Sequence, residues 1–220
     1  MAKQYLEPRV TPAPQSSDGG SIARWGLRDG AGITADWLEA LAQAGQVFVA
    51  NMGSVTTPLT FLVTAANRPD AWIRVPANTT ILPLSCYVAL ESMVGTAQEI
   101  DVRICANDIG NGTSSAASVG PLSVKTGTNY SPTAGNCTAR QLATADTTAE
   151  TSPVSVYRRT YIRADDAGSD WKGIEIDRAK MGYPVLVGAA TWEVFVAATS
   201  TQATGFVVMA WAEITTPRVV

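Results

Sequence analysis

Residues 204–215, TGFVVMAWAEIT, predict a strand that is apolar on both faces. A strand with one face in water alternates apolar and polar side chains. The two faces of this stretch carry Phe206, Val208, Ala210, Ala212 and Ile214 on one side, and Val207, Met209, Trp211 and the lone charge Glu213 on the other. Something must cover the second face: the helix or N-terminal segment of the same chain, a membrane, or another subunit. We favour another subunit, because an exposed apolar patch of this kind normally marks an interaction site.

Eight further stretches have the β-branched and aromatic residues typical of strands, with Gly, Pro, Asn and Asp between them. They are residues 47–52, 58–65, 71–75, 80–92, 99–107, 155–164, 173–178 and 191–199. No helix-length period separates them, so parallel β-α-β units are not expected. Eight or nine strands in one domain favour an all-β fold, an antiparallel sandwich or barrel.

The N-terminal segment differs from the rest of the chain. Residues 1–33 mix Pro, Gly and Ser with isolated apolar residues and show no period. We expect an extended arm that orders only against a surface; a loose tail is the alternative. Residues 34–45 predict one short helix, with Thr34 as its N-cap and Gly45 just after its last turn. The predicted organisation is therefore an arm followed by a single sandwich domain over residues 34–220.

A long excursion rich in Ser and Thr separates two of the predicted strands. It covers residues 108–152 and holds few large apolar residues, with one weak strand near Leu122 to Lys125. An excursion of this length is usually functional or mobile. In a sandwich it would emerge at one end, where recognition loops are carried.

The chain has few charges. Of its 220 residues, 16% are charged, and the net charge is −3. Typical soluble domains carry about 25% charged residues. A surface of Ser, Thr, Asn and Ala is less protected against association, because dispersed ions keep monomers apart. The slightly acidic balance argues against a broad nucleic-acid-binding face, which is usually basic.

The residue types present also limit the chemistry. The chain has no histidine, which excludes Ser-His-Asp and Cys-His catalysis and His-containing zinc sites. Its three cysteines, Cys86, Cys105 and Cys137, have no CxxC spacing. In the predicted strands Cys86 shares an apolar face with Leu82 and Leu84, whereas Cys105 points to the opposite face. These two thiols could not form a disulfide, so we expect reduced cysteines.

Two polar clusters are candidate binding sites with simpler alternatives. Asp165, Asp166 and Asp170 surround a glycine and are a calcium candidate, but the EF-hand spacing is absent and a hairpin turn explains them better. The stretch YRRTYIR, residues 157–163, could place arginines beside tyrosines for base stacking. A solvated sheet face or ion pairing with a neighbouring subunit is the preferred interpretation, so no metal, cofactor or nucleic-acid site is predicted.

The layout resembles that of single jelly-roll capsid or coat proteins of icosahedral viruses and phages. The resemblance rests on an irregular arm, a short helix, about eight strands, the Ser/Thr-rich excursion and the final pair TWEVFVAATSTQATGFVVMAWAEI, over roughly residues 1–216. It implies an antiparallel β-sandwich of jelly-roll type, with the last long strands central in the two sheets and the arm crossing to neighbouring subunits. The charges of this arm nearly cancel, unlike the strongly basic arms of many such proteins, so no direct genome binding is predicted.

These observations predict a virion structural protein made in the host cytoplasm, a capsid, coat or head-decoration subunit that binds copies of itself and other virion proteins. The predicted interface residues are Tyr5, Leu6, Trp25, Val207, Met209 and Trp211. We expect no enzymatic activity and no membrane span, since no stretch approaches about 18 consecutive apolar residues. The alternative is a carbohydrate- or receptor-binding sandwich that uses the loops of residues 108–152.

Overall fold

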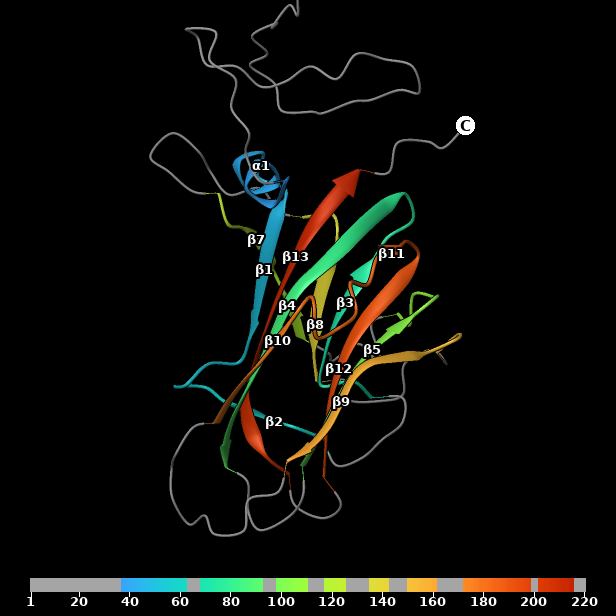
Figure 1. The fold of residues 1–220 in the computed structure, drawn as a ribbon. Coiled ribbons are helices and arrows are strands. Elements are labelled where there is room, and N and C mark those ends of the chain that lie inside the picture. Colours follow the sequence, from blue (N-terminus) through green and yellow to red (C-terminus); the bar gives the residue numbers. More distant parts are fainter. Residues whose placement is uncertain are drawn as a thin grey trace, which may run out of the picture.

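Two antiparallel sheets face each other, and one short helix lies at one end of them (Figure 1). The computed structural model describes residues 37–62, 68–92, 98–110, 117–125, 135–142, 150–161, 172–198 and 202–215. Within these residues the chain is mostly β, and every strand pair is antiparallel. The predicted all-β class and the antiparallel pairing are therefore confirmed.

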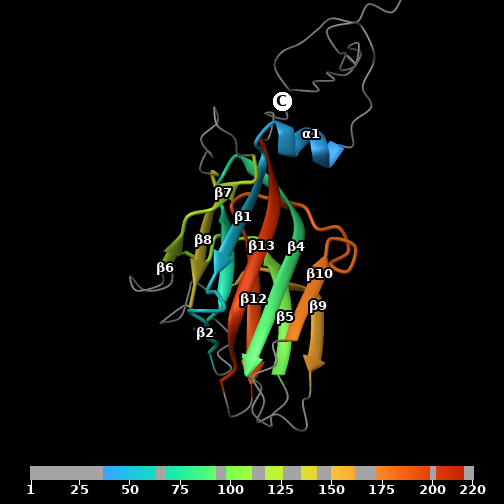
Figure 2. The ribbon, with the colours of Figure 1, turned by 90° about the vertical axis from the view of Figure 1, so that its left-hand side faces the viewer.

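The first sheet has seven strands, with the last strand of the chain near its centre (Figure 2). Its main order is β10 (Lys172–Asp177), β4 (Thr79–Ser92), β13 (Thr204–Thr215), β1 (Val47–Met52) and β7 (Leu122–Ser123). Two short strands extend it: β11 (Leu186–Val187) pairs with β4, and β2 (Leu59–Thr60) pairs with β13.

The second sheet has six strands and lies behind the first in Figure 2. Its order is β6 (Ala117–Val119), β8 (Thr138–Gln141), β3 (Ala71–Val75), β12 (Ala190–Ala198), β5 (Gln98–Cys105) and β9 (Val154–Tyr161). The strand before the last, β12, is central here, so the final two strands occupy the middle of the two sheets.

The longer strands pair in a nested order. Eight described strands have five or more residues: β1, β3, β4, β5, β9, β10, β12 and β13. The first of these pairs with the last, the second with the seventh, the third with the sixth and the fourth with the fifth. Each pair bridges a long stretch of sequence, and even the innermost strands, β5 and β9, lie on either side of the excursion, so most of the fold depends on contacts between distant parts of the chain.

The Ser/Thr-rich excursion contributes strands to both sheets. Its described parts include β6, β7 and β8, of which β7 extends the first sheet beside β1. Strands β8 and β6 extend the second sheet, with β8 beside β3 and β6 beside β8. The weak strand predicted near Leu122 is therefore confirmed. The excursion was expected to form a loop at one end of the sandwich. Its described parts instead form strands along one edge, which corrects that prediction for these residues.

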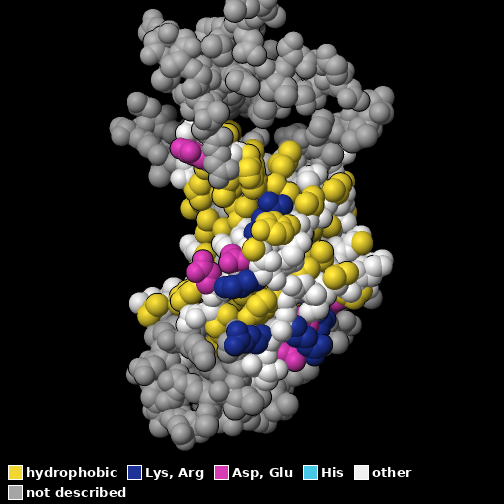
Figure 3. All heavy atoms as spheres, in the orientation of Figure 1, with side chains coloured by type: hydrophobic (Ala, Val, Ile, Leu, Met, Phe, Trp, Pro, Cys, Tyr) yellow, Lys and Arg dark blue, Asp and Glu magenta, His cyan; other side chains and the backbone are white. Residues whose placement is uncertain are grey.

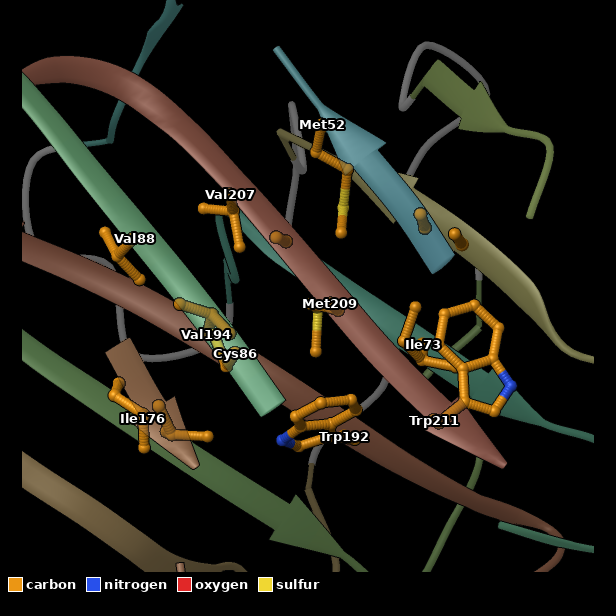
Figure 4. Packing of buried hydrophobic residues seen from close by; sticks show 14 of the residues in the cluster. Met52, Ile73, Cys86, Val88, Ile176, Trp192, Val194, Val207, Met209 and Trp211 are labelled. Carbon is orange, nitrogen blue, oxygen red and sulfur yellow. The ribbon is translucent and has the colours of Figure 1, made fainter. Parts of the chain in front are cut away.

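The core lies between the sheets and includes one face of the last strand (Figure 4). Val207, Met209 and Trp211 have 0% of their surface exposed. They pack in one cluster with Trp192 of β12, which belongs to the opposite sheet. The structure corrects the prediction that these three residues form a subunit interface, because side chains with no exposed surface cannot contact another copy. The second sheet of the same chain covers them.

A bulge in β4 explains a second difference from the sequence-based prediction. Ala210 pairs with Ser85, whereas the next residue, Trp211, pairs with Pro83, so β4 carries one extra residue here. A bulge of this kind shifts the alternation of faces, and it accommodates a proline within a strand. Leu82 and Leu84 are consequently only partly buried, although they were predicted to share the buried face of the following cysteine.

The cysteine predictions are confirmed. Cys86 lies in the main core, whereas Cys105 belongs to a separate cluster with Trp72 and Ile109 on the other side of the second sheet. All three cysteines are free. The helix α1 (Trp37–Gln43) is followed by Gly45 at a φ of 76°, the left-handed conformation that the predicted helix end requires. The predicted N-cap lies outside the described residues.

Two alanine substitutions at adjacent positions of β13 test which face is buried. Met209→Ala should lower the free energy of unfolding by about 2–5 kcal/mol, because it leaves a cavity in the core. Val208→Ala, on the outward face, should cost about 1 kcal/mol or less. Urea unfolding followed by tryptophan fluorescence measures both. Equal losses, or a larger loss for the outward residue, would contradict the assignment of the faces.

Candidate functional site

The outward side of the seven-stranded sheet is largely apolar over its central strands. We define the apolar face by side chains that the strand register places on this side: Val49, Tyr87, Leu122, Val187, Phe206, Val208 and Ile214. Leu122 and Val187 are 60% and 61% exposed. Figure 3, which views the molecule obliquely to this sheet, shows hydrophobic side chains gathered beside α1 and over the upper parts of β13 and β4.

Two aromatic rings lie together on the apolar face. The rings of Tyr87 and Phe206 have centroids 5.9 Å apart and a tilted arrangement, which is favourable for aromatic pairs. The Tyr87 ring also lies across Gly173 of β10, where a Cβ atom would overlap it. A glycine in a strand often marks such a close approach. The ring is thereby held flat on the sheet instead of projecting into water.

Charged and polar groups line the border of the apolar face on the β10 side. Glu175 pairs with Tyr87 and therefore faces outward, and Asp177 of the same strand lies near Lys180. At the helix end, the Arg178 guanidinium lies 5.4 Å from the centroid of the Trp37 ring. An apolar centre with a polar border is the usual anatomy of a protein–protein interface.

The outward side of the six-stranded sheet has the opposite character. Its charges pair with each other: Arg158 lies 2.8 Å from Glu99, and Arg103 lies 2.7 Å from Asp101. Beyond them, Arg74 donates two hydrogen bonds to Asp108. These pairs satisfy the charges within one chain. The two outer faces therefore differ, since the first carries exposed apolar side chains on several strands, whereas the second carries paired charges.

A cleft of about 160 Å³ lies on this charged side. Its lining includes three arginines, three carboxylates and the ring of Phe195: Arg68, Arg103, Arg158, Asp70, Glu99, Asp101 and Phe195. Small-molecule pockets commonly reach about 300–1,000 Å³. The cleft is smaller, and two of its arginines are already paired with carboxylates of the chain. We therefore assign it no ligand.

Asp70 is one of two buried carboxyl groups of the cleft and, like Asp101, has 2% of its surface exposed. Its carboxylate accepts hydrogen bonds from the backbone N–H groups of Leu62 and Val196, both at 2.7 Å. Burial raises the pKa of Asp70 to about 7, and the two N–H donors partly oppose this rise. The carboxylate joins the segment after β2 to the centre of β12, so its role is to hold the fold together.

Glu213 is the one charged residue of the final strand, and its hydrogen bonds explain how it is buried there. It is 4% exposed and accepts hydrogen bonds from the backbone N–H groups of Asn136 and Cys137 at 2.8 and 3.1 Å. The indole N–H of Trp211 donates to it as well, at 3.2 Å. This buried carboxylate fastens the part of the excursion just before β8 to the first sheet. The sequence showed an isolated charge but not these donors, which lie far away in the chain.

Several residues singled out by the sequence lie outside the described residues: Tyr5, Leu6, Trp25, Asp165, Asp166 and Asp170. The predicted arm contacts and the calcium candidate therefore stay predictions. Within the described part of the chain, no group of three or more Cys, Asp or Glu side chains is arranged to hold a metal ion. None of the described residues forms a helix with the length and apolar character needed to cross a membrane.

The arginine- and tyrosine-rich stretch divides between two sides of β9, as its alternation predicts. Tyr157 packs against the main core. Arg158 points outward to its pairing with Glu99. The tyrosine is therefore not free to stack on a base, and the arginine is paired within its own chain rather than with a neighbouring subunit. Arg163 lies outside the described residues.

Comparison of the chain with protein-family models, with curated proteins and with solved structures finds no match.

The pKa of Asp70 generates a prediction about stability. The folded state holds the proton more tightly than the unfolded chain, so the contribution of Asp70 is complete below about pH 4 and is lost as pH rises through about 7. The Asp70→Asn variant cannot titrate at this position. Its stability difference from the unmodified protein, measured by urea unfolding, should change by a few kcal/mol between these pH values. A difference that stays constant or changes in the opposite direction would refute the raised pKa.

Proposed function

We propose that the protein is a virion structural subunit, a capsid, coat or head-decoration protein, that assembles with copies of itself and with other virion proteins. The apolar face of the seven-stranded sheet is the observation that carries the proposal. It replaces the inward residues of β13 as the surface on which copies meet. The protein then acts by association alone, and no bond chemistry is involved.

The nested pairing of strands supports the jelly-roll form of the sandwich. In a jelly roll, a long antiparallel ribbon of paired strands is rolled so that its pairs alternate between two sheets. The pairs β1·β13 and β4·β10 lie in the first sheet, and β3·β12 and β5·β9 lie in the second. Double-sheet jelly rolls occur in viral capsid proteins, but also in lectins and other folds, so this order supports the proposal without carrying it.

The distribution of charge supports association through the first sheet. Burying apolar side chains between copies contributes roughly 25 cal/mol per Å², before the loss of subunit freedom is subtracted. The six-stranded sheet offers less, because its ion pairs would have to be desolvated. With 16% charged residues in the chain, few like charges oppose close packing of many copies.

The alternative function, binding of a carbohydrate or receptor, was predicted from the excursion of residues 108–152. The described parts of that excursion form strands along one edge of the sandwich, where β6 and β8 pair with each other. No observation on these residues favours a sugar over any other partner. A glycan array remains the direct test of this alternative, and specific binding would support it.

Aspartate substitutions on the apolar face should abolish assembly without unfolding the chain. Val208→Asp and Leu122→Asp each place a charge where a second copy would remove it from water. Val154→Asp is the matched control, because Val154 is 53% exposed but belongs to the edge strand β9 of the other sheet. Native mass by light scattering and melting temperature are measured for each variant. Unchanged native mass in both face variants would overturn the proposed surface.

Deletion of residues 1–33 tests the predicted arm. The truncated chain should keep the melting behaviour of the sandwich, because it retains every strand of both sheets, from β1 to β13. It should fail to form the particles of the complete chain, since the arm is proposed to contact neighbouring copies. If light scattering detects the same particles from the truncated protein, the arm is not needed for assembly.

A further inference from the structure

Glu193 is a buried carboxyl group on the outward side of the six-stranded sheet. It has 0% of its surface exposed and pairs in register with Trp72 of β3 and Arg103 of β5. Its Oε1 atom accepts the S–H of Cys105 at 3.2 Å. Its Oε2 atom is buried and receives no hydrogen bond from any donor in the described residues. An unpartnered oxygen at such depth is costly for an ionised carboxylate.

A second carboxyl group lies beside it. Glu150, with an 8% exposed side chain, approaches the Arg103 guanidinium at 3.4 Å. The same guanidinium lies 2.7 Å from Asp101 and stacks over the ring of Phe195. The single positive charge of Arg103 is therefore shared among three carboxyl groups: those of Asp101, Glu150 and Glu193. If all three were ionised, two negative charges would be left uncompensated away from water.

The other charged groups around Glu193 do not remove this excess. On β3, Arg74 is engaged by Asp108 of the adjoining loop. Arg140 of β8 lies one strand further away, in register with Trp72. On β9, Ser155 donates its hydroxyl to Asp101, which satisfies that carboxylate instead of its neighbours. The titratable Cys105 is itself a donor to the cluster. Within the described residues, a proton shared between the two glutamates is the simplest relief.

We propose that Glu193 carries a proton and donates it to Glu150, and that this hydrogen bond fastens residues 150–152 onto the six-stranded sheet. The segment has two further attachments, because the Ala106 N–H donates to the Thr151 carbonyl at 3.0 Å and the Thr151 N–H donates to Asn107 at 2.6 Å. The proton supplies the link from this strap to the centre of the sheet. The strap ends at β9, the edge strand, so its attachment also fixes where that strand begins.

The titration of the pair sets the pH at which the strap opens. Burial, and secondarily the charge of Glu150, raise the pKa of Glu193 to about 8. Below this pH the shared proton is present and the strap is closed. As pH rises through this value the proton is lost, and two adjacent carboxylates repel each other in a partly buried site. This pH-dependent opening of the strap is independent of the proposed assembly. It can therefore be tested on the Val208→Asp variant, which is expected not to assemble.

Hydrogen exchange with mass spectrometry tests the strap. After division by the intrinsic exchange rate, protection of the Thr151 amide should fall by up to about tenfold for each pH unit between about 4.5, the ordinary pKa of a glutamate, and about 8, and should level off above that. In the Glu193→Gln variant, the side chain at position 193 stays neutral and keeps an N–H donor for Glu150. Protection of the Thr151 amide in this variant should therefore not change with pH. The turn after β10 is an internal control, because Tyr183 donates to the Arg178 carbonyl far from any carboxyl pair.

Alkylation of the cysteines provides a second readout. Burial is the main cause that raises the pKa of both Cys86 and Cys105 to about 12, and the charge of Glu193 adds to the rise for Cys105, so ionisation of Glu193 alone would not favour labelling of Cys105. Only Cys105 touches Glu193, and its labelling relative to Cys86 should therefore increase as pH rises to the pKa of Glu193, in the unmodified protein alone. Glu150→Gln, which removes the repulsion from the other partner, should behave like Glu193→Gln and replaces it if that variant does not fold.

Two results would overturn the proposal. One is equal protection of the Thr151 amide in the unmodified protein below and above the pKa. The other is a folded glutamine variant that loses protection in parallel with the unmodified protein, since the strap would then open without the carboxyl pair. Loss of pH dependence in either folded glutamine variant, with the control turn unchanged, supports it.

Discussion

The fold depends on the burial of the last strand between its neighbours and the opposite sheet. β13 pairs with β1 on one side and with β4 on the other, and its inward side chains meet Trp192 of the second sheet. The pair of β1 and β13 is the outermost of the nested pairs, so the first and last long strands close the arrangement. The charge that interrupts the inward face, Glu213, is satisfied by backbone N–H groups of a distant segment. The end of the chain therefore completes both the core and the attachment of the excursion.

This arrangement leaves the two outer faces with different tasks. The face of the seven-stranded sheet carries mainly apolar side chains, with Asn51 and Ser85 among them, and Tyr87, Leu122 and Val187 are its most exposed apolar members. The face of the six-stranded sheet has paired charges, a small buried cluster around Trp72, and the carboxyl pair at Glu193. The proposed association through the first face and the proposed carboxyl-pair switch on the second both rest on this difference. Neither depends on a cofactor or on a reactive nucleophile.

The strands could be predicted from the sequence because alternation and β-branched residues are local signals. β1 and β3 agree with the predicted residues at both ends, and the other long strands agree within a few residues. The orientation of β13 could not be predicted in the same way, since both of its faces are apolar. The larger side chains, Met209 and Trp211, fill the space between the sheets, whereas the outward positions include alanines. The bulge at Pro83 and the donors to Glu213 also depend on distant partners, which a local pattern does not contain.

The surface proposed for assembly is most directly tested by carbene footprinting of the unmodified protein before and after dilution to the dissociated chain. If copies meet on the apolar face, labelling of Tyr87, Leu122 and Val208 should be low in the assembled state and should rise on dissociation. Val154 and Arg158, on the edge strand of the other sheet, should label equally in both states. Equal labelling of the apolar face in both states, or protection confined to β9, would contradict the account.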